Sequence, residues 1–242
     1  MYPKLKFKIN YKRDIETFFA FNNEANFDSG RNLKWAILKK YPQFKKYKQG
    51  NTLNINEDIV KKFVESIYLK NYCLIKKNLS IYQKNWVNIK RNFYLLVDEL
   101  FYQRSWPKGK YIALPTIWGM YPKFLEDKVF QIPYKHKNKK YVSIIIAHEM
   151  LHFIFYDYFD KKYSKYKSNK YIFFVWNISE IFNNVIQNSP GWLKIFRIKS
   201  IPYPEHKKII KKLQKIYYKK ENIIVDDLIK NIIKALISNE RY

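Results

Sequence analysis

Residues 148–152, which read His-Glu-Met-Leu-His, limit the local structure of this chain more than any other feature. Residues four apart lie one above the other on a helix, so both imidazoles are expected on one face. The flanking positions 144–147 and 153–155 are all apolar. A helix that is apolar on most sides is buried. We therefore expect a buried helix over residues 140–159 that carries two histidines and a glutamate.

Buried polar groups need partners, because isolated ones are costly to remove from water. Two neutral imidazoles at this spacing, with a glutamate beside the first, are the groups that a catalytic zinc site uses. His148 and His152 would bind Zn²⁺, and Glu149 would take a proton from a water that the ion activates. The alternative is a buried helix whose histidines are satisfied by hydrogen bonds alone.

A catalytic zinc ion takes a third protein ligand and keeps one position for water. Residues 171–186 form a second apolar stretch, and Glu180 is the single acid in it. Because a buried carboxylate needs a charge partner, Glu180 is the favoured third ligand, on a helix over residues 173–188. A charge near a helix N-terminus is the other interpretation of Glu180. Other side chains considered as ligands are His136, His206, Asp157 and Asp160.

The pattern over residues 145–154 resembles the zincin metallopeptidases, and a glutamate on a following helix is similar to the gluzincin arrangement. The metzincin subgroup does not match, because Phe155 and Tyr158 stand where that subgroup has glycine and histidine. The resemblance implies a zinc-dependent hydrolase that cuts peptide bonds and holds one Zn²⁺ ion. It also implies that Asn184, four residues after Glu180, orients a ligating histidine.

A second donor to the oxyanion is usual in such sites. Tyr203 and His206, in the segment after the third ligand, are the candidates, and an ordinary loop role is the alternative for both.

Short β-like runs occupy residues 111–114, 116–121 and 129–133. Pro115 and Pro122 interrupt them, which favours edge strands. An edge strand beside the zinc would pair with an extended substrate through main-chain bonds. The expected substrate-facing edge is Trp118, Gly119 and Met120, and an ordinary hairpin is the alternative. The predicted fold class is α+β, predominantly helical, with a zincin-like core of a small antiparallel sheet, the active-site helix and the ligand helix.

Residues 1–105 are expected to form a mostly helical N-terminal region, and residues 106–242 the catalytic core, unless the two are one continuous domain. After a strand-like run at 5–9, helices are expected over 14–21, 31–41, 57–77 and 80–101. Ser80 would cap the last of these. Beyond Pro204, two more helices are expected over 205–219 and 225–238.

The formal net charge of +27 favours a nucleic acid or another polyanion as a partner. However, the lysines are spread along the whole chain, and the favoured residue types have A- and T-rich codons, so an AT-rich genome would produce the same bias. We expect a peptide or protein substrate together with non-specific polyanion binding. The alternative function is a basic nucleic-acid-associated or regulatory binding protein with a zincin-like fold.

Cys73 is the single cysteine, so the chain forms no internal disulfide, and its apolar neighbours predict a core thiol. The first residues lack the apolar core of a signal peptide. No window reaches the roughly 18 apolar residues of a membrane span. These features predict a cytoplasmic protein of unspecified oligomeric state.

Overall fold

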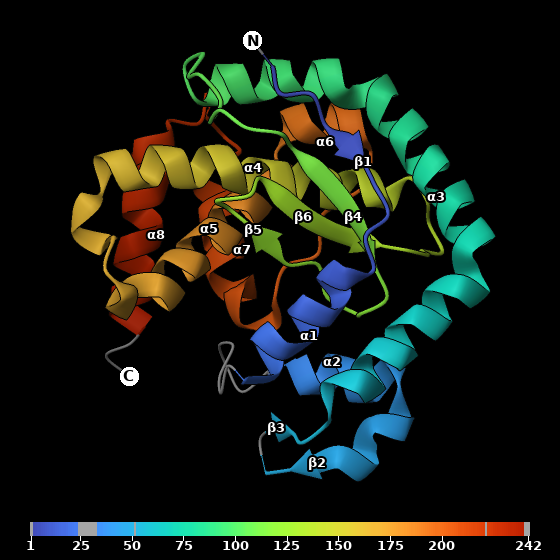
Figure 1. Ribbon diagram of the computed structural model, residues 1–242. Coiled ribbons are helices and arrows are strands. Elements are labelled where there is room, and N and C mark those ends of the chain that lie inside the picture. The colour runs from blue at the N-terminus through green and yellow to red at the C-terminus, as the bar shows by residue number, and fades with distance from the viewer. Residues whose placement is uncertain (1, 24–32, 51, 221, 240–242) are drawn as a thin grey trace. The chain divides into compact units, whose positions relative to one another are not determined.

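The computed structural model describes residues 2–23, 33–50, 52–220 and 222–239, and within them the chain is predominantly helical, as predicted (Figure 1). The α-helices are α1 (Lys12–Asn23), α2 (Leu33–Lys40), α3 (Glu57–Leu100), α4 (Tyr141–Lys162), α5 (Ile172–Gln187), α6 (Pro190–Phe196), α7 (Lys207–Tyr217) and α8 (Val225–Asn239). The strands are β1 (Lys6–Phe7), β2 (Lys48–Gln49), β3 (Thr52–Leu53), β4 (Ile112–Thr116), β5 (Lys123–Phe124) and β6 (Val129–Pro133). Short 3-10 helices are η1 (Pro42–Tyr47), η2 (Ser164–Tyr166), η3 (Asn169–Tyr171) and η4 (Pro204–His206). Residues 31 and 32 of the helix expected over 31–41 lie outside the described residues.

The chain divides into two compact units whose sequences interleave. Unit 1 comprises Tyr2 and the described parts of residues 85–108 and 143–242. Unit 2 comprises the described parts of residues 3–84 and 109–142. A boundary at residue 105 would therefore fall inside a segment of unit 1. Both sequence features proposed to bind metal, the His-Glu-Met-Leu-His run and Glu180, belong to unit 1.

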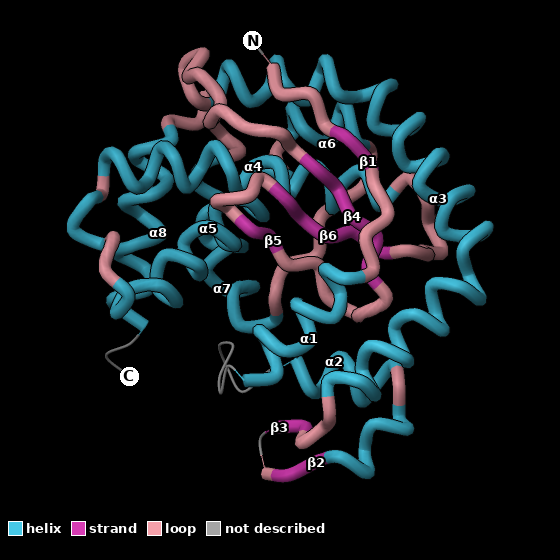
Figure 2. Tube along the Cα trace, viewed as in Figure 1, coloured by secondary structure: helices cyan, strands magenta, loops and turns pink. Residues whose placement is uncertain are grey.

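Unit 2 contains a four-stranded sheet of order β1-β4-β6-β5 (Figure 2). β4 pairs in parallel with both β1 and β6, and only β5 runs antiparallel to β6. The prediction of an antiparallel sheet is therefore wrong for most of these pairs. The chain passes through β5 between β4 and β6, so β5 takes the antiparallel position and β6 returns in the direction of β4. A separate antiparallel pair is formed by β2 and β3.

β4 is an interior strand of the sheet although it contains Pro115. The sequence predicted an edge strand here because of this proline. The N–H of Ile112 bonds to the carbonyl of Lys128 on the β6 side. Alternate residues of a parallel strand face opposite neighbours, so position 115 faces the β1 side. The pairing of β1 ends at Phe7, opposite Ala113, and Pro115 lies beyond it. The N–H of Lys8 bonds to the carbonyl of Ala113, and the proline lacks the N–H that would continue this ladder, so the pairing with β1 ends here.

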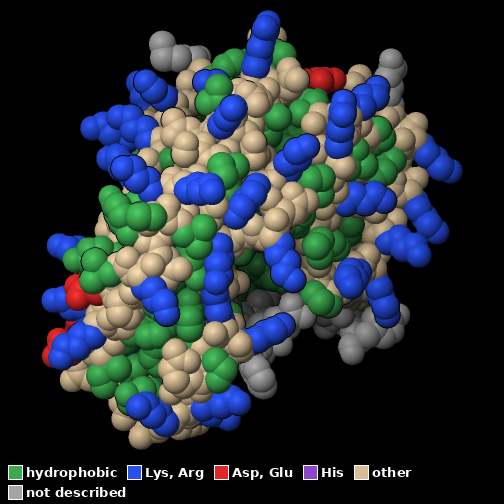
Figure 3. All heavy atoms as spheres, turned by 90° about the vertical axis from the view of Figure 1, so that its right-hand side faces the viewer, with side chains coloured by type: hydrophobic (Ala, Val, Ile, Leu, Met, Phe, Trp, Pro, Cys, Tyr) green, Lys and Arg blue, Asp and Glu red, His purple; other side chains and the backbone are tan. Residues whose placement is uncertain are grey.

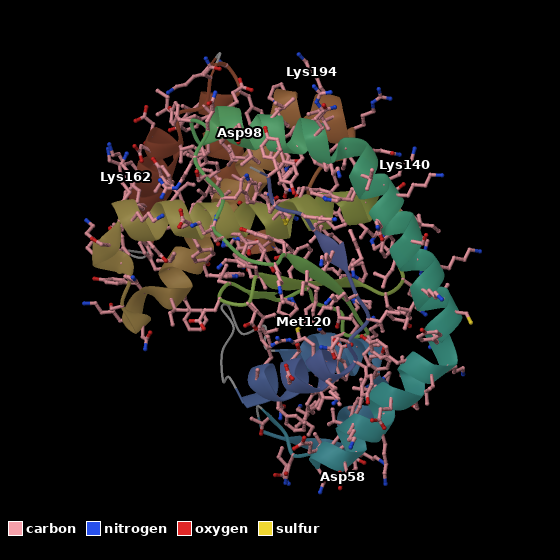
Figure 4. The ribbon with its side chains drawn as sticks, turned by 45° about the horizontal axis from the view of Figure 1, so that its top comes forward. Asp58, Asp98, Met120, Lys140, Lys162 and Lys194 are labelled. Carbon is pink, nitrogen blue, oxygen red and sulfur yellow. The ribbon has the colours of Figure 1, made fainter. Side chains whose placement is uncertain are left out.

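The segment Trp118, Gly119 and Met120 follows β4 and lies outside any strand. Trp118 is fully buried, its Nε1 donates to the carbonyl of Asp14 at 2.8 Å, and its ring centroid lies 5.5 Å from that of Phe18. Met120, labelled in Figure 4, belongs to the loop that leads toward β5. The expected substrate-facing edge strand is therefore not formed here, because Trp118 is part of the core of unit 2.

α3 is one continuous helix of 44 residues where the sequence predicted two. No proline or glycine interrupts it. Asn78, near the expected break, is 2% exposed and its Nδ2 donates to the carbonyl of Tyr134 at 2.8 Å. Ser80 is an exposed residue inside the helix and does not begin one. Cys73 is exposed on the same helix, so the prediction of a core thiol is wrong.

Unit 1 is helical, and α5, α7 and α8 pack against one another (Figure 1). Phe155 of α4 and Phe182 of α5 have ring centroids 5.0 Å apart, which makes these two helices neighbours. At the end of α4, Lys162, labelled in Figure 4, contacts Asp226 of α8. The helices predicted over 140–159, 173–188 and 225–238 are confirmed, with ends that differ by at most three residues. None of the helices described is long and apolar enough to cross a membrane.

Candidate metal centre

His148 and His152 lie one turn apart on α4 and direct the same ring atom at one carboxylate on α5. Nε2 of His148 is 3.0 Å from Oε2 of Glu180, and Nε2 of His152 is 3.2 Å from Oε1. The two ring centroids are 4.7 Å apart, with the ring planes at 85°. Within the part of the chain that the structure describes, these residues form the one group of histidine, cysteine or acidic side chains able to hold a metal ion.

The spacing and the chemistry of these three side chains fit a zinc ion. Zinc bonds of about 2.0–2.1 Å at tetrahedral angles place neighbouring ligand atoms about 3.3 Å apart. The nitrogen–oxygen separations of 3.0 and 3.2 Å are close to that value. The side chains of His148, His152 and Glu180 are 16%, 1% and 5% exposed, so water reaches the cluster mainly beside His148.

The charges around the cluster favour a bound cation. Burial alone would lower the pKa of His148, but the charge of Glu180 and its hydrogen bond, with a further contribution from Glu149, raise it to about 9. Without a metal ion, the nearby carboxylates therefore favour the protonated form of His148. Glu149 is itself 6% exposed, so two carboxylates are buried beside the imidazoles. A proton or a metal ion supplies the positive charge that these carboxylates require.

Two amide side chains of α5 fix α4 at the first histidine. Gln187 donates from Nε2 to the carbonyl of Ile144 at 3.0 Å, and its Oε1 lies 2.9 Å from Nδ1 of His148. Asn183 donates from Nδ2 to the carbonyl of His148 at 3.1 Å. Because the amide nitrogen of Gln187 is committed to Ile144, its oxygen accepts the proton of Nδ1. The Nε2 atom of His148 is therefore the one that faces Glu180.

Comparison of the chain with protein-family models, with curated proteins and with solved structures gave no match.

Asn184 does not make the contact that the sequence predicted for it. Its Nδ2 donates to the carbonyl of Glu180 at 3.4 Å, and its Oδ1 has no hydrogen-bond partner among the described residues. The residue that orients the ring of His148 is Gln187. Glu180, Asn183 and Gln187 are spaced i, i+3 and i+7 and share one side of α5. Asn184, at i+4, lies on the same side, so the spacing alone does not distinguish it from Gln187.

His206 and Tyr203 lie beside the first half of α5. Nε2 of His206 is 2.5 Å from Oδ1 of Asn177, one turn before Glu180, and His206 is 2% exposed. The ring of Tyr203 is 5.3 Å from that of Trp176 and is more exposed. The role of either side chain as an oxyanion donor stays a prediction.

Asp157, considered as a ligand, is engaged elsewhere. Its carboxylate pairs with Arg104 at 3.0 Å and with Lys161 at 2.9 Å. The contact with Arg104 is partly buried and that with Lys161 is exposed, and both agree with the structural role that the helical position of Asp157 favoured. His136, the other histidine considered, has its Nδ1 2.7 Å from the carbonyl of Asn138.

Proposed function

We propose that the protein is a zinc-dependent metallopeptidase that holds one Zn²⁺ ion through His148, His152 and Glu180. The observation that carries the proposal is the convergence of both Nε2 atoms on the two oxygens of one carboxylate, at 3.0 and 3.2 Å. Catalytic zinc sites use three nitrogen or oxygen ligands from the protein and leave a position for water. Closed structural sites favour cysteine, and this chain has one cysteine.

The zincin assignment, with a gluzincin-like third ligand, is part of the same proposal. Its support is the His-Glu-Met-Leu-His run on the buried helix α4, followed by a glutamate on the neighbouring helix α5. A peptide or protein is the substrate class that this assignment implies.

Each side chain has a distinct task in this proposal. When bound, a zinc ion would lower the pKa of a water molecule and would polarise the carbonyl group of the substrate. Glu149 accepts the proton of the water as the water oxygen attacks the scissile carbonyl carbon, and then passes that proton to the leaving amine nitrogen. Gln187 keeps the imidazole of His148 in the orientation that presents Nε2 to the centre of the cluster.

The substitution Glu149→Gln tests the proposal, because it keeps the shape of the side chain and removes the base. The purified zinc-loaded variant should retain its metal and lose hydrolysis of a fluorogenic peptide library by a factor on the order of 10²–10⁴. Glu205→Gln, a change of the same kind at an exposed position, is the control and should cleave like the parent. Parental rates in Glu149→Gln would exclude the general-base role. A zinc-loaded parent that cleaves no peptide would exclude the peptidase.

A basic binding protein for nucleic acid, or a regulatory one, is the second candidate. Figure 3 shows lysine and arginine side chains spread over one face among hydrophobic residues, with few acidic ones. A spread of this kind favours non-specific attraction to polyanions over a shaped recognition surface. Binding to an oligonucleotide that weakens steeply with salt and shows no sequence preference is the expected result. Sequence-selective binding would favour the second candidate.

A further inference from the structure

A cleft in unit 1 is built from residues that do not belong to the candidate metal centre. It has a volume of about 540 Å³ and is lined by residues of α6, of α7 and of the segment 199–202 that precedes α7. Clefts that hold small molecules have volumes of about 300–1,000 Å³. The cleft is therefore large enough for a small ligand, and neither histidine of α4 nor Glu180 lines it.

The charged side chains that line the cleft are all basic. They are Lys199, Lys207 and Lys211, and no acidic residue is among the described residues of the lining. Lys207 and Lys211 are one turn apart on α7, so their ammonium groups occupy the same side of that helix. Like charges at this spacing repel each other. A bound anion would relieve that repulsion, and lysine ammonium groups commonly bind phosphate as point charges.

Another part of the lining is apolar. Pro190 and Leu193 of α6, Pro202 of the segment before α7, and Ile210 of α7 contribute to it. An apolar wall of this kind would shield the hydrocarbon part of a bound ligand from water, and so favours a ligand with an apolar portion. Inorganic phosphate alone would leave the apolar part of the cleft unfilled.

The walls of the cleft are held in place by hydrogen bonds that are buried or partly buried. Oδ1 of Asn188 accepts the N–H of Ser200 at 2.9 Å, and its Nδ2 donates to the carbonyl of Ser200 at 3.1 Å. Tyr218 donates its hydroxyl proton to the carbonyl of Val185 at 2.8 Å. The segment that carries Lys199 is therefore fixed to the end of α5. Preorganised walls reduce the entropy that a ligand loses on binding.

We propose that this cleft binds a phosphate monoester that carries an apolar group. Three lysines face the phosphate, and the apolar wall formed with Leu193 and Ile210 contacts the ester group. The proposal does not depend on the metallopeptidase activity, because the cleft and the metal ligands share no lining residue.

Phenyl phosphate is the probe, and isothermal titration calorimetry of the full chain at fixed ionic strength is the measurement. Saturable binding at one site is expected, with an affinity at least about tenfold higher than that of inorganic phosphate. Phenol should not bind detectably, and a phosphotyrosine peptide tests whether the ester can be part of a polypeptide. Equal affinity for phosphate and phenyl phosphate would show that the apolar side chains do not contribute to binding, and would overturn that part of the proposal. Absence of saturable binding would overturn it, and so would a site that takes the phosphopeptide but not phenyl phosphate.

Two double variants of α7 test whether the lysine charges that line the cleft bind the phosphate. Lys207→Gln/Lys211→Gln removes two lysines that line the cleft, and Lys208→Gln/Lys212→Gln removes two that do not. The first should weaken phenyl phosphate binding about tenfold or more, and the second should change it less than about twofold. All four lysines are exposed, so both variants should fold like the parent. Equal losses in the two variants would show general charge attraction and would overturn the proposal.

Discussion

Oε1 of Gln187 lies 2.9 Å from Nδ1 of His148, and this contact determines which nitrogen of the ring faces Glu180. The amide nitrogen of Gln187 is held by the carbonyl of Ile144 on the same helix as His148. The glutamine therefore bridges two positions one turn apart on α4. A side chain bonded in this way limits both the orientation and the tautomer of a ligating histidine.

Replacement of Gln187 by leucine should weaken zinc binding by a factor of about 10–100, because the ring of His148 loses its acceptor. Competition with a chromophoric chelator measures the affinity. Asn184→Ala is the matched control, since the Oδ1 of Asn184 has no hydrogen-bond partner among the described residues, and it should have a much smaller effect. A larger loss in Asn184→Ala than in Gln187→Leu would restore the role that the sequence predicted for Asn184.

The cluster itself could be predicted from sequence because each part depends on one helix. The spacing of His148 and His152 fixes their common face, and Glu180 is the single acid in its apolar stretch. The choice between Asn184 and Gln187 could not be made in the same way. Both are polar residues one or two turns after Glu180, and the side of α5 that meets α4 is decided by packing between the helices.

Substitutions of Asn78 and Ser80 test whether α3 continues through these two positions. Asn78→Ala should lower the free energy of unfolding by about 1–3 kcal/mol, because the carbonyl of Tyr134 loses a buried hydrogen bond. Ser80→Ala should be neutral or slightly stabilising, since alanine is favoured inside an exposed helix. Urea denaturation of both variants measures these changes. A loss of about 1 kcal/mol or more in Ser80→Ala would indicate a helix cap at this position.

The predictions of an edge strand at Pro115 and of an antiparallel sheet were wrong for a different reason. The sequence identified β-like runs near β4 and β6, but the partners of each strand depend on parts of the chain distant in sequence. β1 supplies a parallel neighbour to only the first residues of β4, at Ile112 and Ala113. Pro115 is tolerated in an interior strand because that neighbour ends before it.

Asp14 should make the stability of the protein depend on pH. The side chain is fully buried, and burial raises its pKa from 3.8 to about 6, although hydrogen bonds from the N–H of Ile117 and the hydroxyl of Tyr68 oppose the shift. A raised pKa in the folded state gives a contribution to stability that is full below pH 3.8 and is lost as pH rises through about 6.

The substitution Asp14→Asn isolates that contribution. The unfolding free energy of the parent minus that of Asp14→Asn should fall by roughly 2 kcal/mol between pH 4 and pH 7, because other groups cancel in the difference. Urea denaturation at a series of pH values measures it. A difference that grows with pH would show that the pKa of Asp14 is lowered in the folded protein.

The zinc content of the purified protein, measured by mass spectrometry after dialysis against a weak chelator, tests the central claim most directly. The account predicts one zinc ion per chain in the parent and almost none in Glu180→Gln, because that change removes the carboxylate that both Nε2 atoms face. A parent that keeps no zinc, or a Glu180→Gln variant that keeps as much zinc as the parent, would contradict it.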